Sequence, residues 1–237
     1  PYVVGVFLHS REDFMELNKY IDHTNLKAYA KEEDIKKLCE EAVEYGFASV
    51  CVNPYYVKYA SELLKNTNIS VCTVIGFPLG QNTIDVKEYE AINAIQNGAD
   101  EIDMVVNIAA IKDGKFDYVK KEIETVRDSA EGKILKVIIE TCYLTSDEII
   151  KMTEICNETF VNFIKTSTGF GTSGAKEEDV RLMNEHKMDY LEIKASGGIK
   201  NYDDATKFIE AGATRLGTSS GVAIMNGCIH KNCECEE

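Results

Sequence analysis

The chain has comparatively little positive charge and no long hydrophobic run. Its 237 residues include 26 lysines and arginines against 40 aspartates and glutamates, which gives a formal net charge of −14. This acidic excess argues against nucleic acid or an anionic membrane surface as the main partner. No apolar stretch reaches the length of a membrane span, and the opening residues PYVVGVFLHS lack the basic start of a signal peptide. We therefore expect a cytoplasmic protein with neither nucleic acid nor a membrane as its partner.

The sequence also lacks the features that would divide it into parts. It has no linker, no low-complexity stretch and no block of like charges that would indicate a second domain. No glycine-rich nucleotide fingerprint or P-loop follows the first predicted strand. An open, doubly wound sheet is therefore less favoured than a closed one.

Short apolar runs alternate with helical patterns along most of the chain. The eight runs are YIDHTNL, ASVCVN, ISVCTVIGF, EIDMVVN, LKVIIET, FVNFIKTST, YLEIKAS and TRLGTSS. Nearly continuous apolar strands separated by helices are typical of a parallel sheet covered by helices, and closure of eight such units into a barrel is the economical arrangement. We predict a (β/α)8 TIM barrel of the α/β class over residues 20–225. Residues 1–19 are expected to form an arm or helix, and 226–237 a disordered cysteine-rich tail.

The expected helices have an apolar face and are followed by glycine. One such face comprises Ile35, Leu38, Cys39, Ala42 and Val43, and another comprises Phe116, Val119, Ile123 and Val126. Gly46, Gly98 and Gly212 follow expected helices, and helix C-termini favour glycine. We predict that helices end at these glycines.

The eight cysteines are scattered through the chain rather than arranged as a disulfide framework. Five fall in predicted strands or helices, which is typical of reduced thiols in a cytosolic enzyme. The other three lie in the tail sequence CIHKNCEC with His230. This span is short for a tetrahedral zinc site, so we expect no metal site, and metal capture by the tail remains an alternative.

Two lysines at the ends of successive predicted strands are the most informative residues. Lys165 ends the strand in FVNFIKTSTGFG and Lys194 ends the strand in YLEIKASGG. A buried lysine is rare, and two neighbouring ammonium groups lower each other's pKa. A neutral amine attacks carbonyl carbon, which is the chemistry that Schiff-base catalysis requires.

Other ionisable groups are expected at the same end of the barrel. The predicted strand ends carry Asp22, Cys51 with Asn53, Thr73, Asp103, Glu140, Lys165, Lys194 and Ser219. Asp103 stands within an apolar strand, so it either pairs with a buried lysine or moves protons in carbinolamine and enamine steps, and both roles are compatible. Glu192 is expected to share a strand face with Lys194 and to pair with a lysine deeper in the barrel.

Glycine-rich turns follow three adjacent predicted strands. Gly169 and Gly171 follow the sixth, Gly197 and Gly198 follow the seventh, and LGTSSG ends the eighth before a short helix. Exposed backbone amides and a helix N-terminus at this place form the phosphate site of many barrels. The alternative is three tight turns that bind no ligand.

Together these segments resemble the deoxyribose-phosphate aldolase family. The resemblance runs from about residue 20 to residue 223. It covers DHTNL, VCVNP, GFPLG, EIDMVVN, LKVIIET, FIKTSTGFG, KASGGI and LGTSS in that order. It implies a metal-independent class I aldolase without a cofactor. Such an enzyme reversibly cleaves 2-deoxy-D-ribose 5-phosphate to D-glyceraldehyde 3-phosphate and acetaldehyde, so its partners are a small sugar phosphate and an aldehyde. A homodimer is also compatible with the sequence.

The resemblance further implies roles for individual residues. Lys165 would form the Schiff base, Lys194 would lower the pKa of Lys165, and Asp103 would transfer protons. The residues expected to bind substrate, mainly at the pocket wall and the phosphate, are Asp22, Thr24, Cys51, Thr168, Gly169, Gly197, Gly198, Gly217, Ser219 and Ser220. Phe170 stands where some members carry a lysine, so phosphate would depend more on backbone amides. The chain has no tyrosine after Tyr202, whereas some members have a tyrosine in a tail that reaches the site.

Other functions are compatible with parts of this pattern. A Schiff-base aldolase or transaldolase for a different sugar phosphate would use the same lysines. A pyridoxal-phosphate barrel would also combine an imine-forming lysine with a glycine-rich phosphate site. A barrel that binds a phosphosugar without catalysis is the alternative outside enzymes.

Overall fold

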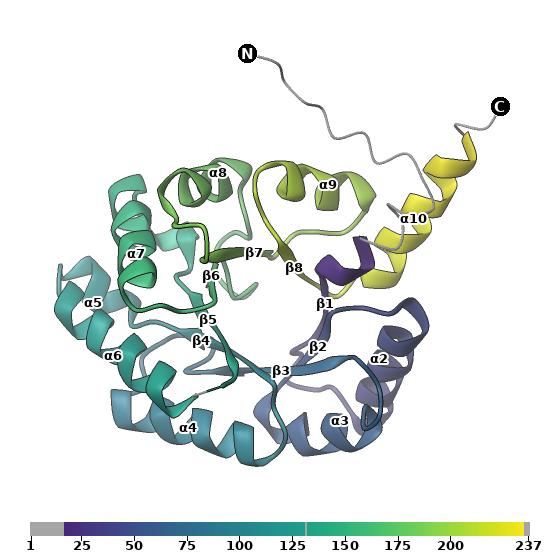
Figure 1. Ribbon diagram of the computed structural model, residues 1–237, viewed down its shortest axis with the longest axis horizontal. Coiled ribbons are helices and arrows are strands. Elements are labelled where there is room, and N and C mark those ends of the chain that lie inside the picture. Colours follow the sequence, from purple (N-terminus) through teal and green to yellow (C-terminus); the bar gives the residue numbers. More distant parts are fainter. Residues whose placement is uncertain (1–16, 131, 235–237) are drawn as a thin grey trace.

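The computed structural model describes residues 17–130 and 132–234, with side chains described as far as residue 228. Most of the predicted N-terminal arm, residues 1–16, and the last three residues therefore lie outside the described part. The eight strands are β1 (Ile21–Asn25), β2 (Ser49–Val52), β3 (Ser70–Ile75), β4 (Glu101–Val105), β5 (Ile134–Ile138), β6 (Phe163–Lys165), β7 (Glu192–Ser196) and β8 (Arg215–Thr218). Each strand pairs with the next in parallel, and β8 pairs with β1. The predicted (β/α)8 barrel is confirmed (Figure 1).

The helices form a ring outside the strands (Figure 1). They are α2 (Glu32–Tyr45), α3 (Val57–Leu63), α4 (Ile84–Gln96), α5 (Ile108–Lys112), α6 (Phe116–Ser129), α7 (Ser146–Glu158), α8 (Glu177–His186), α9 (Tyr202–Glu210) and α10 (Gly221–Glu234). Short 3₁₀ turns occupy Asn18–Tyr20, Pro54–Tyr56 and Thr141–Tyr143. None of the helices in the described ranges is long and apolar enough to cross a membrane.

The apolar faces predicted for α2 and α6 are largely buried against the sheet. Ile35, Leu38, Cys39 and Ala42 on α2 and Val119, Ile123 and Val126 on α6 are all buried. The prediction for Val43 was wrong, because its side chain is 48% exposed. Each helical residue turns by about 100°, so the position after Ala42 faces away from the strands.

Two features at helix ends bear on the predictions. Gly46, after α2, has a φ of +66°, and its N–H bonds to the carbonyl of Val43 at 3.3 Å. Gly98 and Gly212 also have positive φ, as predicted for glycines that end helices. At the other end of the chain the structure differs from the expected disordered tail, since α10 continues to Glu234.

The apolar core lies between the strands and the surrounding helices, with Phe47, Ile102 and Met225 among its fully buried members. The interior of the barrel is different, because several charged side chains are enclosed there. Residues alternate between the two faces of each strand, which separates the apolar outer layer from this charged interior.

Candidate active site

The register of the barrel places the two predicted lysines side by side. Lys165 on β6 is opposite Lys194 on β7, and Asp103 on β4 is opposite Lys136 on β5. Neighbouring strands are about 4.8 Å apart, so in-register residues that point inward have close side chains. Lys165 is 3% exposed, and Lys194 and Asp103 are fully buried.

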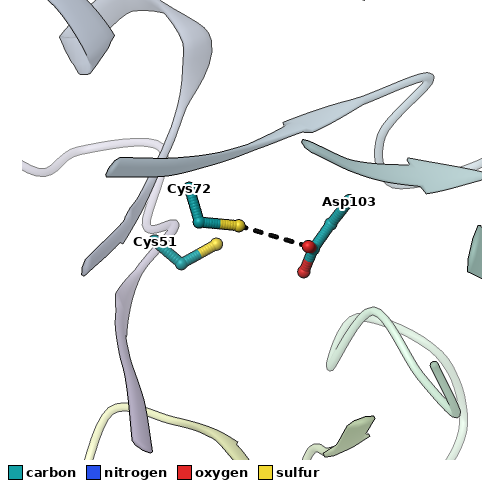
Figure 2. A group of neighbouring side chains, drawn as sticks. All are labelled: Cys51, Cys72 and Asp103. Carbon is teal, nitrogen blue, oxygen red and sulfur yellow. Dashed lines mark hydrogen bonds between the residues drawn. The ribbon is translucent and has the colours of Figure 1, made fainter. Parts of the chain in front are cut away.

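Asp103 connects the lysines. Its Oδ2 accepts hydrogen bonds from Nζ of Lys165 and from Nζ of Lys194, each at 2.7 Å. Its Oδ1 accepts from Nζ of Lys136 at 3.0 Å and from the thiol of Cys72 at 3.2 Å, the contact drawn in Figure 2. Burial alone would raise the pKa of Asp103, but the charges of the three lysines hold that pKa well below its ordinary value.

A second charged layer lies next to Asp103. Nη1 of Arg215 is 2.6 Å from Oδ1 of Asp22 and 3.2 Å from Oε2 of Glu101. Glu101 also makes a short contact with Lys136. Oδ2 of Asp22 lies 2.5 Å from Nζ of Lys194. Burial opposes ionisation of Asp22, but Lys194 and Arg215 lower its pKa, so this carboxylate is charged.

The charges of this interior do not balance when every group is ionised. The cations are Lys136, Lys165, Lys194 and Arg215, and the anions are Asp22, Glu101 and Asp103. Burial favours the neutral form of Lys194, but Asp103 and Asp22 raise its pKa above the ordinary value. The pKa of Lys136 is likewise raised against the effect of burial, by the carboxylates of Asp103, Glu101 and Asp22. Counted over the described residues, four cations against three anions leave one excess positive charge, which is absent when Lys165 is neutral.

Lys165 is also the cation of this group that reaches the open cleft. The cleft has a volume of about 610 Å³ at the carboxyl ends of the strands. The predicted site residues in its wall are Thr24, Lys165, Thr168, Gly169, Gly197, Gly198, Gly217, Ser219 and Ser220. Asp22, Cys51, Asp103 and Lys194 are fully buried and are not among the described residues that line it. The structure therefore brings the predicted site residues together. Asp22 and Cys51 lie beneath the wall of the cleft, whereas we expected them to form part of that wall.

The glycine-rich turns have the backbone that the sequence suggested. Gly169, Gly197 and Gly198 have φ values of +85°, +85° and +87°, which favour glycine. A Cβ on Gly217 would lie 3.1 Å from Cε of Lys194, so this glycine provides room for the lysine. Ser219 and Ser220 directly precede α10, whose first turn contains no acidic side chain. A helix N-terminus of this kind attracts anions.

The predictions from the sequence missed some residues of the site and assigned others to different partners. Lys136 in LKVIIET and Glu101 in EIDMVVN are charged residues in apolar strands, the same signal that identified Asp103. Glu192 was expected to pair with a deeper lysine, but the partner of Lys136 is Glu101, and Glu192 makes no ion pair among the described residues. Glu140 accepts from the amide of Thr168 at 3.1 Å, so it supports the wall of the cleft.

One cluster resembles a metal site in composition only. The ligand atoms of Cys51, Cys72 and Asp103 all lie within 4.8 Å of one another (Figure 2). Zinc is bound by thiolate. The contact between the two thiols lowers the pKa of Cys51, but burial and the same contact raise the pKa of Cys72 well above its ordinary value. Both oxygens of Asp103 already accept from ammonium groups, which would repel a cation. Asp103 in this cluster is therefore a partner for lysine ammonium groups rather than a ligand of a divalent ion.

The chain can be compared with known proteins on this basis. A model described as DeoC/LacD family aldolase matches residues 17–227. The deoxyribose-phosphate aldolase of Thermococcus gammatolerans is 57% identical over 217 residues, 90% of this chain and 96% of that protein. The solved structure of QR15, an aldolase, has a TM-score of 0.88 at 42% identity and covers 92% of this chain and 98% of its own.

A second solved structure, the tetrameric deoxyribose phosphate aldolase from Aeropyrum pernix, has a TM-score of 0.85 at 31% identity. It covers 91% of this chain and 92% of its own. The matches span the barrel and both lysine strands, and they confirm the resemblance that the motifs indicated. This chain belongs to the DeoC/LacD family of aldolases.

Proposed function

We propose that this protein is a class I aldolase that reversibly cleaves 2-deoxy-D-ribose 5-phosphate into D-glyceraldehyde 3-phosphate and acetaldehyde. Support comes from relatives of nearly the same length, such as the Thermococcus gammatolerans protein with this name. The observation that carries the mechanism is the position of Lys165. It is the interior lysine in the wall of the cleft, and its neighbours are balanced in charge when it is neutral.

Lys165 is the proposed nucleophile. Its neutral amine attacks the aldehyde carbon of the open-chain sugar, and loss of water from the carbinolamine produces an imine. Lys194 keeps its charge because Asp103 and Asp22 stabilise the ammonium group. That charge disfavours a second ammonium group on Lys165.

The protonated imine withdraws electrons from the neighbouring carbon–carbon bond. A base removes the proton of the adjacent hydroxyl group, the bond between C2 and C3 breaks, and D-glyceraldehyde 3-phosphate leaves. The enamine of acetaldehyde stays on Lys165, takes up a proton at carbon and is hydrolysed. Asp103 shares Oδ2 between the two lysine nitrogens, so we assign it the passage of protons between Lys194, water and the adduct.

The other end of the cleft would hold the phosphate. The amides near Gly169, Gly197 and Gly198 and the start of α10 after Ser219 and Ser220 surround the same cleft as Lys165. Backbone amides and a helix N-terminus bind phosphate well even in an acidic protein. Phe170 also lines this cleft, so no lysine is available at that position, and the amides carry more of the binding.

Two further expectations concern the location of the protein and its oligomeric state. A cytoplasmic location agrees with the buried thiols of Cys39, Cys51, Cys72 and Cys156, none of which forms a disulfide. A homodimer stays a prediction, and the related Aeropyrum pernix aldolase is tetrameric.

Borohydride trapping tests the proposed function directly. Reduction in the presence of 2-deoxy-D-ribose 5-phosphate should leave a stable adduct, which peptide mass mapping should place on Lys165. Lys27, Lys37 and Lys200 line the same cleft and are the internal comparison. An adduct spread over these surface lysines, or none on Lys165 while the sugar is bound, would contradict the mechanism.

A further inference from the structure

His23 occupies an unusual position between two helices of the barrel. It follows Asp22 on β1, and its side chain lies on the outer side of the strand, where Nε2 is 2.7 Å from Oε2 of Glu41 on α2. The ring packs on Phe47 with a centroid distance of 5.1 Å. His23 is only 2% exposed. The imidazole is therefore held in one place by a carboxylate and an aromatic ring.

The other ring nitrogen, Nδ1, is buried and has no hydrogen-bond partner among the residues that the structure describes. A Cβ built on Gly221, the first residue of α10, would lie 2.9 Å from Nδ1 of His23. The lack of a side chain at Gly221 thus lets the helix start approach the imidazole. Buried polar atoms almost always have partners, so an unpaired nitrogen here marks the contact between β1 and the start of α10 as a place where side-chain and helix positions are set together.

The start of α10 also borders the end of the active-site cleft where the phosphate is proposed to bind. His23, Ser219, Ser220 and Lys165 all line the same cleft. The first N–H groups of the 14-residue helix α10 have no partners within the helix and carry partial positive charge. Burial lowers the pKa of His23, and Glu41 only partly opposes this. A neutral ring that donates from Nε2 to Glu41 keeps its lone pair on Nδ1, beside Gly221 at the start of α10.

We propose that His23 is a positioning residue for the substrate phosphate. Glu41 fixes the imidazole, and the imidazole fixes the first turn of α10 relative to β1, so that the backbone amides of that turn meet the phosphate while the aldehyde reaches Lys165. This inference rests on the proposed function and adds a specificity determinant to it. His23 itself touches neither the reacting carbon nor Lys165.

Two substitutions test the contributions of Nδ1 and Nε2 of His23 separately. His23→Gln can keep a donor near Glu41 but has no polar atom at the place of Nδ1, whereas His23→Asn has one there and loses the bond to Glu41. Both variants are compared with 2-deoxy-D-ribose 5-phosphate and with unphosphorylated 2-deoxy-D-ribose. We expect His23→Gln to raise KM for the phosphorylated sugar by a factor about ten times larger than the factor by which it lowers kcat/KM for the unphosphorylated sugar. A tenfold difference in affinity corresponds to about one hydrogen bond to a charged group. His23→Asn should show a smaller difference.

Matched control variants distinguish a specific effect on phosphate binding from a general loss of structure. Glu41→Gln should reproduce the phosphate-selective loss in part, whereas Glu40→Gln, whose side chain is 66% exposed, should not. His186→Asn on the exposed end of α8 is the control for loss of a histidine. Equal losses on the two sugars would show a merely structural role for His23 and overturn the proposal. So would an unchanged KM in both His23 variants.

Binding of inorganic phosphate, measured by calorimetry, keeps the inference separate from the proposed function. Wild-type protein that cleaves neither sugar would contradict the proposed function, while about tenfold weaker phosphate binding by His23→Gln would still support the role of His23. Active wild-type protein with equal phosphate affinity in the His23 and control variants would overturn this inference alone. Glu41→Gln provides the same test if the His23 variants do not fold.

Discussion

Lys165 and Lys194 donate to one and the same oxygen atom, Oδ2 of Asp103, at 2.7 Å each. Two ammonium groups on one carboxylate oxygen repel each other strongly in a buried site. Lys194 has a second carboxylate, Asp22 at 2.5 Å, whereas Asp103 is the only carboxylate paired with Lys165 in the described part of the chain. Lys165, the lysine beside the cleft, is therefore the one of the two whose positive charge is less compensated.

Lys165→Met should abolish turnover while the protein stays folded. The substitution removes the nucleophile and leaves the other three cations and the three carboxylates of the interior paired with one another, so we expect no loss of thermal stability. Steady-state kinetics, borohydride trapping and circular dichroism check this. Measurable Schiff-base turnover in the variant would assign the nucleophile to another lysine.

Lys194→Met should lower kcat at neutral pH by roughly a hundredfold or more, because the charge that disfavours protonation of Lys165 is gone. Activity should then recover in part as the pH is raised, since a higher pH deprotonates the remaining amine. A pH–rate profile from pH 6 to 10 measures this. A profile with the wild-type shape would show that Lys194 acts only as a structural partner of Asp103 and Asp22.

Asp103→Asn should retain substrate binding but lose most of kcat, because the amide cannot accept and return protons as the carboxylate does. The variant should also lose stability, by about 3–5 kcal/mol, since removing one partner leaves buried ammonium groups uncompensated. Chemical denaturation and the separate values of kcat and KM test the two effects. Unchanged turnover would reduce Asp103 to an ion-pair partner.

Acid should weaken the fold through the same carboxylates. The folded-state pKa values of Asp103 and Asp22 are depressed, so their stabilisation is fully present above the unfolded value of about 3.9 and is lost as the pH falls below it. Unfolding free energy should therefore decline steeply below about pH 4 in the wild type and less steeply in Asp103→Asn. Equal slopes in the two proteins would contradict this account.

A second buried ion pair should be important for stability. Nζ of Lys87 on α4 lies 2.5 Å from Glu122 on α6 and 2.8 Å from the carbonyl of Gly80, and both ionic side chains are fully buried. Glu122→Gln should cost about 3–5 kcal/mol, and Lys87→Met with Glu122→Leu should recover much of it. The exposed pair Lys120 and Glu158 is the control, expected to contribute less than about 1 kcal/mol. A double variant as unstable as Glu122→Gln would show that packing, not the unpaired charge, dominates.

Local patterns in the chain are sufficient for the architecture and for the central trio. The eight apolar runs and the glycines after helices predict the barrel, because strand and helix periods are local properties. Lys165, Lys194 and Asp103 are recognisable since each is a charge in an apolar strand, and parallel strands bring such residues to one interior. The same signal was present at Lys136, but its spacing alone does not reveal which carboxylate it meets.

The sequence by itself determined the elements of this protein, their order and the residues able to form an imine, because these depend on neighbours a few positions apart. Only the tertiary structure decided the pairing. Arg215 meets Asp22 across 193 positions when β8 closes on β1, which leaves the interior with one cation too many. Closure likewise places Gly221 against His23. Such contacts depend on strand register and barrel closure, which no local pattern encodes.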